Sequence, residues 1–188
     1  MKMAKPVKST DDYFFDTDCI SAFLWVNHQN ILAKLYPGRI IIPQQVYDEL
    51  CYVPELKYKV ANMLANDDVK LMDIDYGTPE YDDFEEMTQH PPNEFKIIGN
   101  GEASAIALVR AHGGVIASNN TRDIYYYVEK YNLNAVSTGD ILVEAYKRNL
   151  ITEEEGNQIW KNMINHHRWL PTKTFTEYLE RKNPIQSK

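Results

Sequence analysis

YFFDTDCIS, residues 13–21, joins an apolar run, an acidic residue and the start of a helical pattern in one short stretch. The run Tyr13-Phe14-Phe15 offers apolar side chains to both faces of a strand, as strands do inside a parallel sheet. Asp16 ends this run. A carboxylate at the end of a buried strand costs free energy unless it faces a site. The stretch therefore predicts a central parallel strand with a functional acid at its carboxyl end.

Apolar runs and helical patterns alternate along the rest of the chain. Further strands are expected at residues 39–42, 69–72, 115–117 and 135–136. Helical patterns occupy residues 18–36, 43–65, 101–112, 122–132 and 139–149. This alternation predicts an α/β protein with a central, mostly parallel five-stranded sheet and helices on both of its faces.

Two segments lie outside this regular alternation. Residues 76–96 are rich in acids and predict an exposed helix followed by a loop. Residues 152–182 predict one or two C-terminal helices, because Thr152 and Glu155 have the spacing of a capping box. We expect a single domain spanning residues 1–188, with its core at about 12–150 and this helical extension after it.

Charge is distributed unevenly along the 188 residues. The net charge of −7 argues against a protein that coats nucleic acid with its whole surface. Residues 145–188 nevertheless hold 8 basic and 5 acidic side chains, so broad phosphate contact is expected there. His166-His167-Arg168 lies in this region, and both a phosphate contact and a plain solvated face remain open for it.

Nothing in the sequence predicts a membrane or secreted protein. No run approaches the roughly 18 apolar residues that span a bilayer, and the N-terminal residues 1–12 lack the apolar core of a signal peptide. Cys19 and Cys51 are the two cysteines, and each lies in an apolar pattern. We expect buried, reduced thiols and a cytoplasmic location.

Four acids follow the expected strands or open the helices after them. They are Asp16, Glu49 in IPQQVYDEL (42–50), Glu102 in GNGEASAIALV (99–109) and Asp123 in IASNNTRD (116–123). Each alone is explained by helix capping or by the helix dipole. Together they are expected to converge, since ligands of open α/β sheets bind at the carboxyl ends of the strands. Clustered carboxylates without nearby histidine or cysteine favour Mg²⁺ or Mn²⁺.

Neighbouring polar residues are assigned by the same geometry. Thr17 and Ser21 are candidates to orient Asp16 or a bound water, with ordinary capping as the alternative. Asp18 is expected to point away from the site, as is Asp48 on the second helix. Asp140 is expected to cap the helix that follows the last strand.

The four motifs resemble those of the PIN-domain ribonucleases, which include the VapC-type toxins of bacterial toxin–antitoxin pairs. The likeness spans about residues 12–155, and VSTGDILVEAYKRNLIT (136–152) resembles the stretch after the last strand in one subfamily. It implies a three-layer α/β/α sandwich and an endoribonuclease that hydrolyses RNA with Mg²⁺ or Mn²⁺. It also implies that the four acids are both catalytic residues and metal ligands. A small antitoxin partner and homodimerisation are further features of such proteins.

The fourth motif departs from the family pattern, because Asn119 and Asn120 stand where many members have an acid directly after the strand. Asp123 is then expected to supply the charge, with both asparagines beside the metal. Two alternatives stay open. One is a catalytically silent PIN-like module that binds RNA or protein. The other is a haloacid-dehalogenase-like phosphohydrolase, in which Asp16 is the nucleophile, Asp18 the acid/base and Asp140 part of the metal site.

Overall fold

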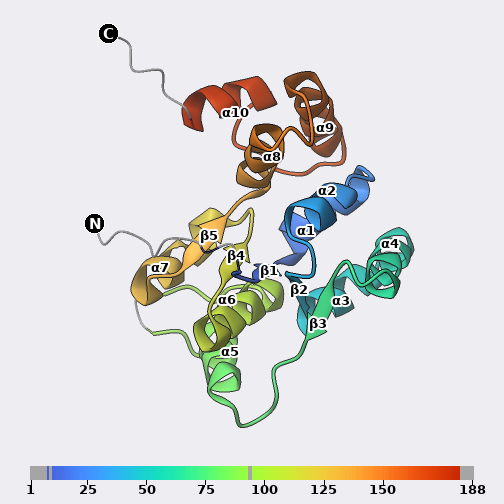
Figure 1. Ribbon diagram of the computed structural model, residues 1–188. Helices are drawn as coiled ribbons and strands as arrows, with labels where there is room; N and C mark the ends of the chain where they lie inside the picture. Colours follow the sequence, from blue (N-terminus) through green and yellow to red (C-terminus); the bar gives the residue numbers. More distant parts are fainter. Residues whose placement is uncertain (1–7, 9, 93–94, 183–188) are drawn as a thin grey trace.

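The computed structural model describes residues 8, 10–92 and 95–182, and its strands form one five-stranded sheet in the order β3-β2-β1-β4-β5 (Figure 1). The strands are β1 (Tyr13–Phe15), β2 (Ile40–Pro43), β3 (Lys70–Met72), β4 (Val115–Ala117) and β5 (Asn134–Val136). Every neighbouring pair is parallel. The predicted strands are thus confirmed to within one residue at each end.

Helices pack against both faces of the sheet, which confirms the three-layer α/β/α arrangement. Side chains alternate between the faces along each strand, so Phe14 and Ile41 join one buried cluster, whereas Phe15 and Ile42 join the other. The first cluster includes residues of α5 (Pro79–Gln89), α6 (Asn100–His112) and α7 (Thr121–Tyr131). The second includes residues of α1 (Thr17–Trp25), α2 (Asn30–Leu35), α3 (Gln44–Cys51), α4 (Pro54–Ala65), α8 (Thr138–Lys147), α9 (Glu153–Asn165) and α10 (Phe175–Lys182).

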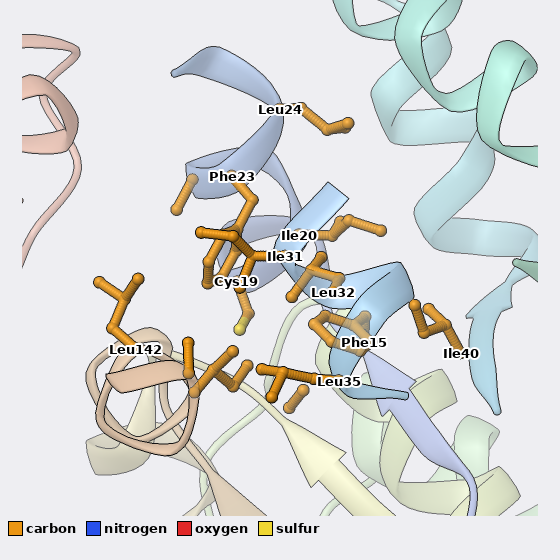
Figure 2. Close-up of a cluster of buried hydrophobic side chains, with 14 of the residues drawn as sticks. Phe15, Cys19, Ile20, Phe23, Leu24, Ile31, Leu32, Leu35, Ile40 and Leu142 are labelled. Carbon is orange, nitrogen blue, oxygen red and sulfur yellow. The ribbon is translucent and has the colours of Figure 1, made fainter. Parts of the chain in front are cut away.

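The second cluster holds α1 firmly beside the end of β1. Figure 2 shows side chains of α1 meeting those of β1, β2, α2 and α8, and Cys19 lies fully buried among them. The labelled residues are Phe15, Cys19, Ile20, Phe23, Leu24, Ile31, Leu32, Leu35, Ile40 and Leu142. Because α1 begins directly after β1, this packing sets the position of Asp16 between them.

Two of the predicted helices are each divided in two. The pattern over 18–36 forms α1 and α2, because Asn27 between them adopts a left-handed conformation with φ 58°. The pattern over 43–65 forms α3 and α4, because Val53 is extended immediately before Pro54. Apolar periodicity continues across both breaks and therefore did not reveal them.

The outlying segments form α5, α9 and α10. The capping box of α9 is confirmed, since Thr152 N donates to Glu155 Oε2 at 2.7 Å and Glu155 N donates to Thr152 Oγ1 at 3.2 Å. Helix α5 is less exposed than expected, because Met87 and Thr88 on its last turns are buried. In Figure 1, α8, α9 and α10 gather at the end of the molecule where α1 and α2 lie.

Both cysteines are free, and Cys51 is half-buried rather than buried as expected. No helix within the described part of the chain is long and apolar enough to cross a membrane. The prediction that residues 1–12 are not a signal peptide falls mainly on residues 1–7 and 9, which lie outside the described residues.

Candidate carboxylate site

The site lies where the strand order reverses, beside β1 and β4. Tyr13 pairs with Ile40 on one side and with Val115 on the other, so the carboxyl end of β1 lies next to the carboxyl end of β4. Asp16 N donates to Ala117 O at 2.9 Å, which joins the two strand ends directly. Such a switch point is where open α/β sheets bind ligands.

Asp16 is the most deeply buried acid at this point, with 1% of its surface exposed. It caps α1, because its Oδ1 accepts a hydrogen bond from Cys19 N at 2.7 Å. Its Oδ2 is also buried and has no hydrogen-bond partner among the described residues. A carboxylate oxygen in this condition is costly unless a proton or a cation compensates it.

The same burial raises the pKa of Asp16 to about 7, and the negative charges of Glu102 and Asp18 act in the same direction. The neighbouring Ser118 hydroxyl, at the end of β4, lowers this pKa but does not outweigh the burial. Ser118 itself is buried. Asp16 therefore requires a nearby positive charge to be fully ionised near neutral pH.

Glu49 reaches the site from α3 and is oriented by Thr17, whose hydroxyl donates to Glu49 Oε2. Thr17 was a candidate to orient Asp16 or a bound water, with capping as the alternative, and the hydrogen bond that its hydroxyl makes here is to Glu49. Gly101 lies against this pair, since a Cβ atom there would be 2.9 Å from Thr17 Oγ1 and 3.3 Å from Glu49 Oε2. The absence of a side chain at Gly101 thus leaves the space that Thr17 and Glu49 share.

Glu102 opens α6 and is held at both carboxylate oxygens. Its Oε2 accepts from Gly99 N at 2.8 Å, and its Oε1 accepts from Asn120 Nδ2 at 2.8 Å. Asn120 Nδ2 also donates to Asp123 Oδ2 at 2.8 Å. One amide group, which has two N–H donors, therefore links Glu102 to Asp123.

The four predicted acids are not equally placed. Asp16, Glu49 and Glu102 line one cavity of about 180 Å³, together with Thr17, Asp18, Gly99 and Gly101. Asp123 is outside this lining and is connected to Glu102 through Asn120. Within the described ranges, no three His, Cys, Asp or Glu side chains stand close enough together to enclose a metal ion. Asn119 does not line this cavity either, and its Oδ1 accepts from Thr138 N at the start of α8.

Asp18 differs from its prediction, because it lines the carboxylate cavity and also a second cavity of about 360 Å³. This second cavity is lined by Asp18, Asn119, Asn120, His167, Arg168 and Trp169. Arg168 Nη1 lies 3.6 Å from Asp18 Oδ1 and 3.5 Å from Ser21 Oγ. Ser21 donates to Asp18 O at 3.3 Å, so it contacts Asp18 and Arg168 rather than orienting Asp16.

Comparison with known proteins gives one match that covers most of the chain. A family model described as a PIN domain, DUF3368, matches residues 12–184. The chain belongs to the PIN-domain family. No curated protein and no solved structure matches it. Members of this family are generally nucleases, so the fold is nuclease-like.

Membership of the PIN-domain family goes against the haloacid-dehalogenase alternative, and so does the position of Asp140. Asp140 Oδ2 accepts from Ser137 N at 3.0 Å in a capping box of α8, as expected. Its Oδ1 accepts from Tyr178 Oη at 3.0 Å and lies 2.6 Å from Lys182 Nζ. In this PIN domain Asp140 therefore fastens α10 to α8.

Proposed function

We propose that this PIN domain is a divalent-metal-dependent endoribonuclease. The observation that carries the proposal is the unpartnered, buried Oδ2 of Asp16 beside a cavity that Glu49 and Glu102 also line. A cation would compensate this oxygen and would allow Asp16 to ionise at neutral pH. An aromatic or aliphatic lining would have argued for an apolar ligand, whereas these groups are anionic.

The chemistry of the donor set fits a hard cation, and the three carboxylates, which do not stand close enough together in this structure to enclose an ion, would have to move together to hold it. Asp16, Glu49 and Glu102 would hold it, since carboxylate oxygens select Mg²⁺ or Mn²⁺ over softer metals. When bound, the ion supplies activation of water and stabilisation of negative charge on the phosphodiester. Thr17 orients Glu49, and the Gly99 amide and the Asn120 side chain orient Glu102. Asp123 does not line the cavity. In this proposal it adds a negative charge next to the site, and Asn120 links it to Glu102.

The direct test is cleavage of single-stranded RNA by the purified protein. We expect cleavage with Mn²⁺ or Mg²⁺, internal cuts in a circular RNA substrate, and loss of activity when a chelator is added. A circular substrate distinguishes an endonuclease from an exonuclease because it has no ends. Cleavage that persists in the chelator would contradict the metal-dependent mechanism.

Replacing Gly101 by alanine tests whether the Thr17–Glu49 pair belongs to the metal site. Alanine stabilises a helix relative to glycine by about 1 kcal/mol. This gain offsets the cost of the close contact that the new Cβ makes, so the unfolding free energy should change little. The new Cβ would crowd Thr17 Oγ1 and displace Glu49. We expect Mn²⁺ affinity, measured by calorimetric titration, to fall by about tenfold or more, the usual effect of disturbing groups that orient ligands. Unchanged affinity with an unchanged melting temperature would place this pair outside the metal site.

A silent RNA- or protein-binding module is the second candidate, and the position of Asn120 favours it. Asn120 Nδ2 occupies oxygens of Glu102 and Asp123 that an enzyme would use for metal. Such a module would show neither cleavage nor Mn²⁺ binding. The enzyme proposal includes a cytoplasmic toxin that a small antitoxin protein inhibits. Growth arrest of cells that express the wild type, but not of cells that express Asp16→Asn, would support the toxin role.

A further inference from the structure

The segment between α9 and α10 places a cation and an exposed aromatic ring next to the carboxylate cavity. Arg168 and Trp169 both line the 360 Å³ cavity, which shares Asp18 with the carboxylate cavity. Both also line a third cavity of about 670 Å³, to which Lys173 and Arg181 contribute positive charge and Glu177 one negative charge. The carboxylate cavity and the 360 Å³ cavity therefore adjoin at Asp18, and the 360 Å³ and 670 Å³ cavities adjoin at Arg168 and Trp169.

The side chain of Trp169 does not take part in the packing of the C-terminal helices. The extension is anchored by fully buried Trp160 and Phe175, and Trp160 Nε1 donates to Thr172 O at 3.0 Å. Trp169 instead has 71% of its surface exposed. The exposed indole offers a flat face on which a base can stack, beside a polar cavity that Arg168 also lines.

Arg168 is positioned by its neighbours rather than left free. Its Nε donates to His166 O at 3.1 Å, and its Nη1 lies near Asp18 and Ser21. This positive charge offsets Asp18, which would otherwise repel a phosphate at the point where the first two cavities meet. The net charge of −7 means that a polyanion can be attracted only by such a local group of cations.

We propose that Arg168 and Trp169 form a docking surface for single-stranded RNA, with a base stacked on Trp169 and a phosphate beside Arg168. The proposal rests on the proposed function and names where the substrate strand leaves the carboxylate cavity. Stacking on an aromatic ring is sequence-tolerant, and a cationic groove follows the backbone. Base stacking explains the exposed ring, and phosphate contact explains the adjacent Arg168, Lys173 and Arg181.

The test is RNA binding without cleavage, measured by fluorescence anisotropy of a labelled single-stranded oligoribonucleotide in the presence of a chelator. We expect Trp169→Ala to weaken Kd by about tenfold or more, and Trp169→Phe to retain most of the affinity. Arg168→Gln should reduce the salt dependence of log Kd by about 0.7, as expected for one lost phosphate contact. Tyr58→Ala on α4 is the matched control, because Tyr58 is also exposed, at 69%.

The outcomes separate this inference from the proposed function. A wild type that cuts RNA with Mn²⁺, but whose Kd and KM are unaffected by Trp169→Ala and Arg168→Gln, would overturn the docking surface and leave the nuclease standing. A protein that never cuts RNA, yet binds it through Trp169, would keep the surface and reject the nuclease. A wild type with no affinity for RNA would overturn the docking surface as well.

Discussion

Asp16→Asn should abolish metal-dependent RNA cleavage and should make the metal-free protein more stable at pH 8. Loss of a metal-holding carboxylate removes several kcal/mol of transition-state stabilisation, so we expect cleavage to fall by about a hundredfold or more. The fold should persist, because asparagine is as good an N-cap as aspartate and can still accept from Cys19 N.

The stability gain follows from the pKa of Asp16. The folded protein holds the proton up to a pKa of about 7, whereas the unfolded chain releases it near the ordinary value of 3.8. Below about pH 4 Asp16 is protonated in both states, so folding has no cost for burying its charge. The unfolding free energy of the wild type then falls as the pH rises from about 4 to about 7. Asparagine has no such penalty. At pH 8 without metal we expect the variant to be more stable by an amount on the order of a few kcal/mol.

Urea unfolding from pH 4 to pH 8 in a chelator measures this difference. Asp18→Asn is the matched control, because Asp18 is the exposed acid beside the same cavity. Mn²⁺ should restore stability to the wild type at pH 8 and do little for Asp16→Asn. Parallel pH profiles for the wild type and Asp16→Asn would show that burial of Asp16 carries no electrostatic penalty and would remove the main support for a cation there.

Asn120→Asp is expected to have opposite effects on stability and on metal affinity. The substitution replaces the amide that donates to both Glu102 and Asp123 with a third carboxylate. Hydrogen bonds to charged groups contribute about 1.5–3 kcal/mol each, so losing both should lower the unfolding free energy of the metal-free protein by about 3–6 kcal/mol. Mn²⁺ affinity should rise about tenfold, since the added charge lies beside the proposed ligands.

Asn119→Asp is the control for added charge. Asn119 Oδ1 already accepts from Thr138 N at the start of α8, and a carboxylate can accept the same bond beside the positive end of the helix dipole. Its stability should change by less than about 1 kcal/mol, in the favourable direction. If Asn119→Asp and Asn120→Asp behave alike, the bridging role of Asn120 is wrong.

Asp123→Asn then tests whether Asp123 acts in the metal site. If Asp123 supplies charge to the metal site, Asp123→Asn lowers cleavage strongly. If it only favours the start of α7, the substitution costs less than about 1 kcal/mol and leaves cleavage unchanged. A wild type that neither cuts RNA nor binds Mn²⁺, and gains both with Asn120→Asp, would establish the silent module.

The sheet and its five strands were predictable because each strand is a local apolar run, and alternation with helices determines a parallel sheet. That Asp16, Glu49 and Glu102 line one cavity was predictable for a related reason. Asp16 follows a strand, Glu102 opens a helix and Glu49 lies on the helix after β2, and parallel strands bring those ends to one edge. The breaks at Asn27 and Val53 were missed, since apolar periodicity continues through them.

The sequence by itself therefore determined the fold class and the edge of the sheet that carries the acids. Only the tertiary structure decided which donor holds each acid: Thr17 holds Glu49, and Asn120 holds both Glu102 and Asp123. It also decided that Arg168 and Trp169 line one cavity with Asp18. The physical reason is that local patterns define elements and faces. Contacts between residues far apart in the chain depend on how α1, α6 and the C-terminal helices pack around one core.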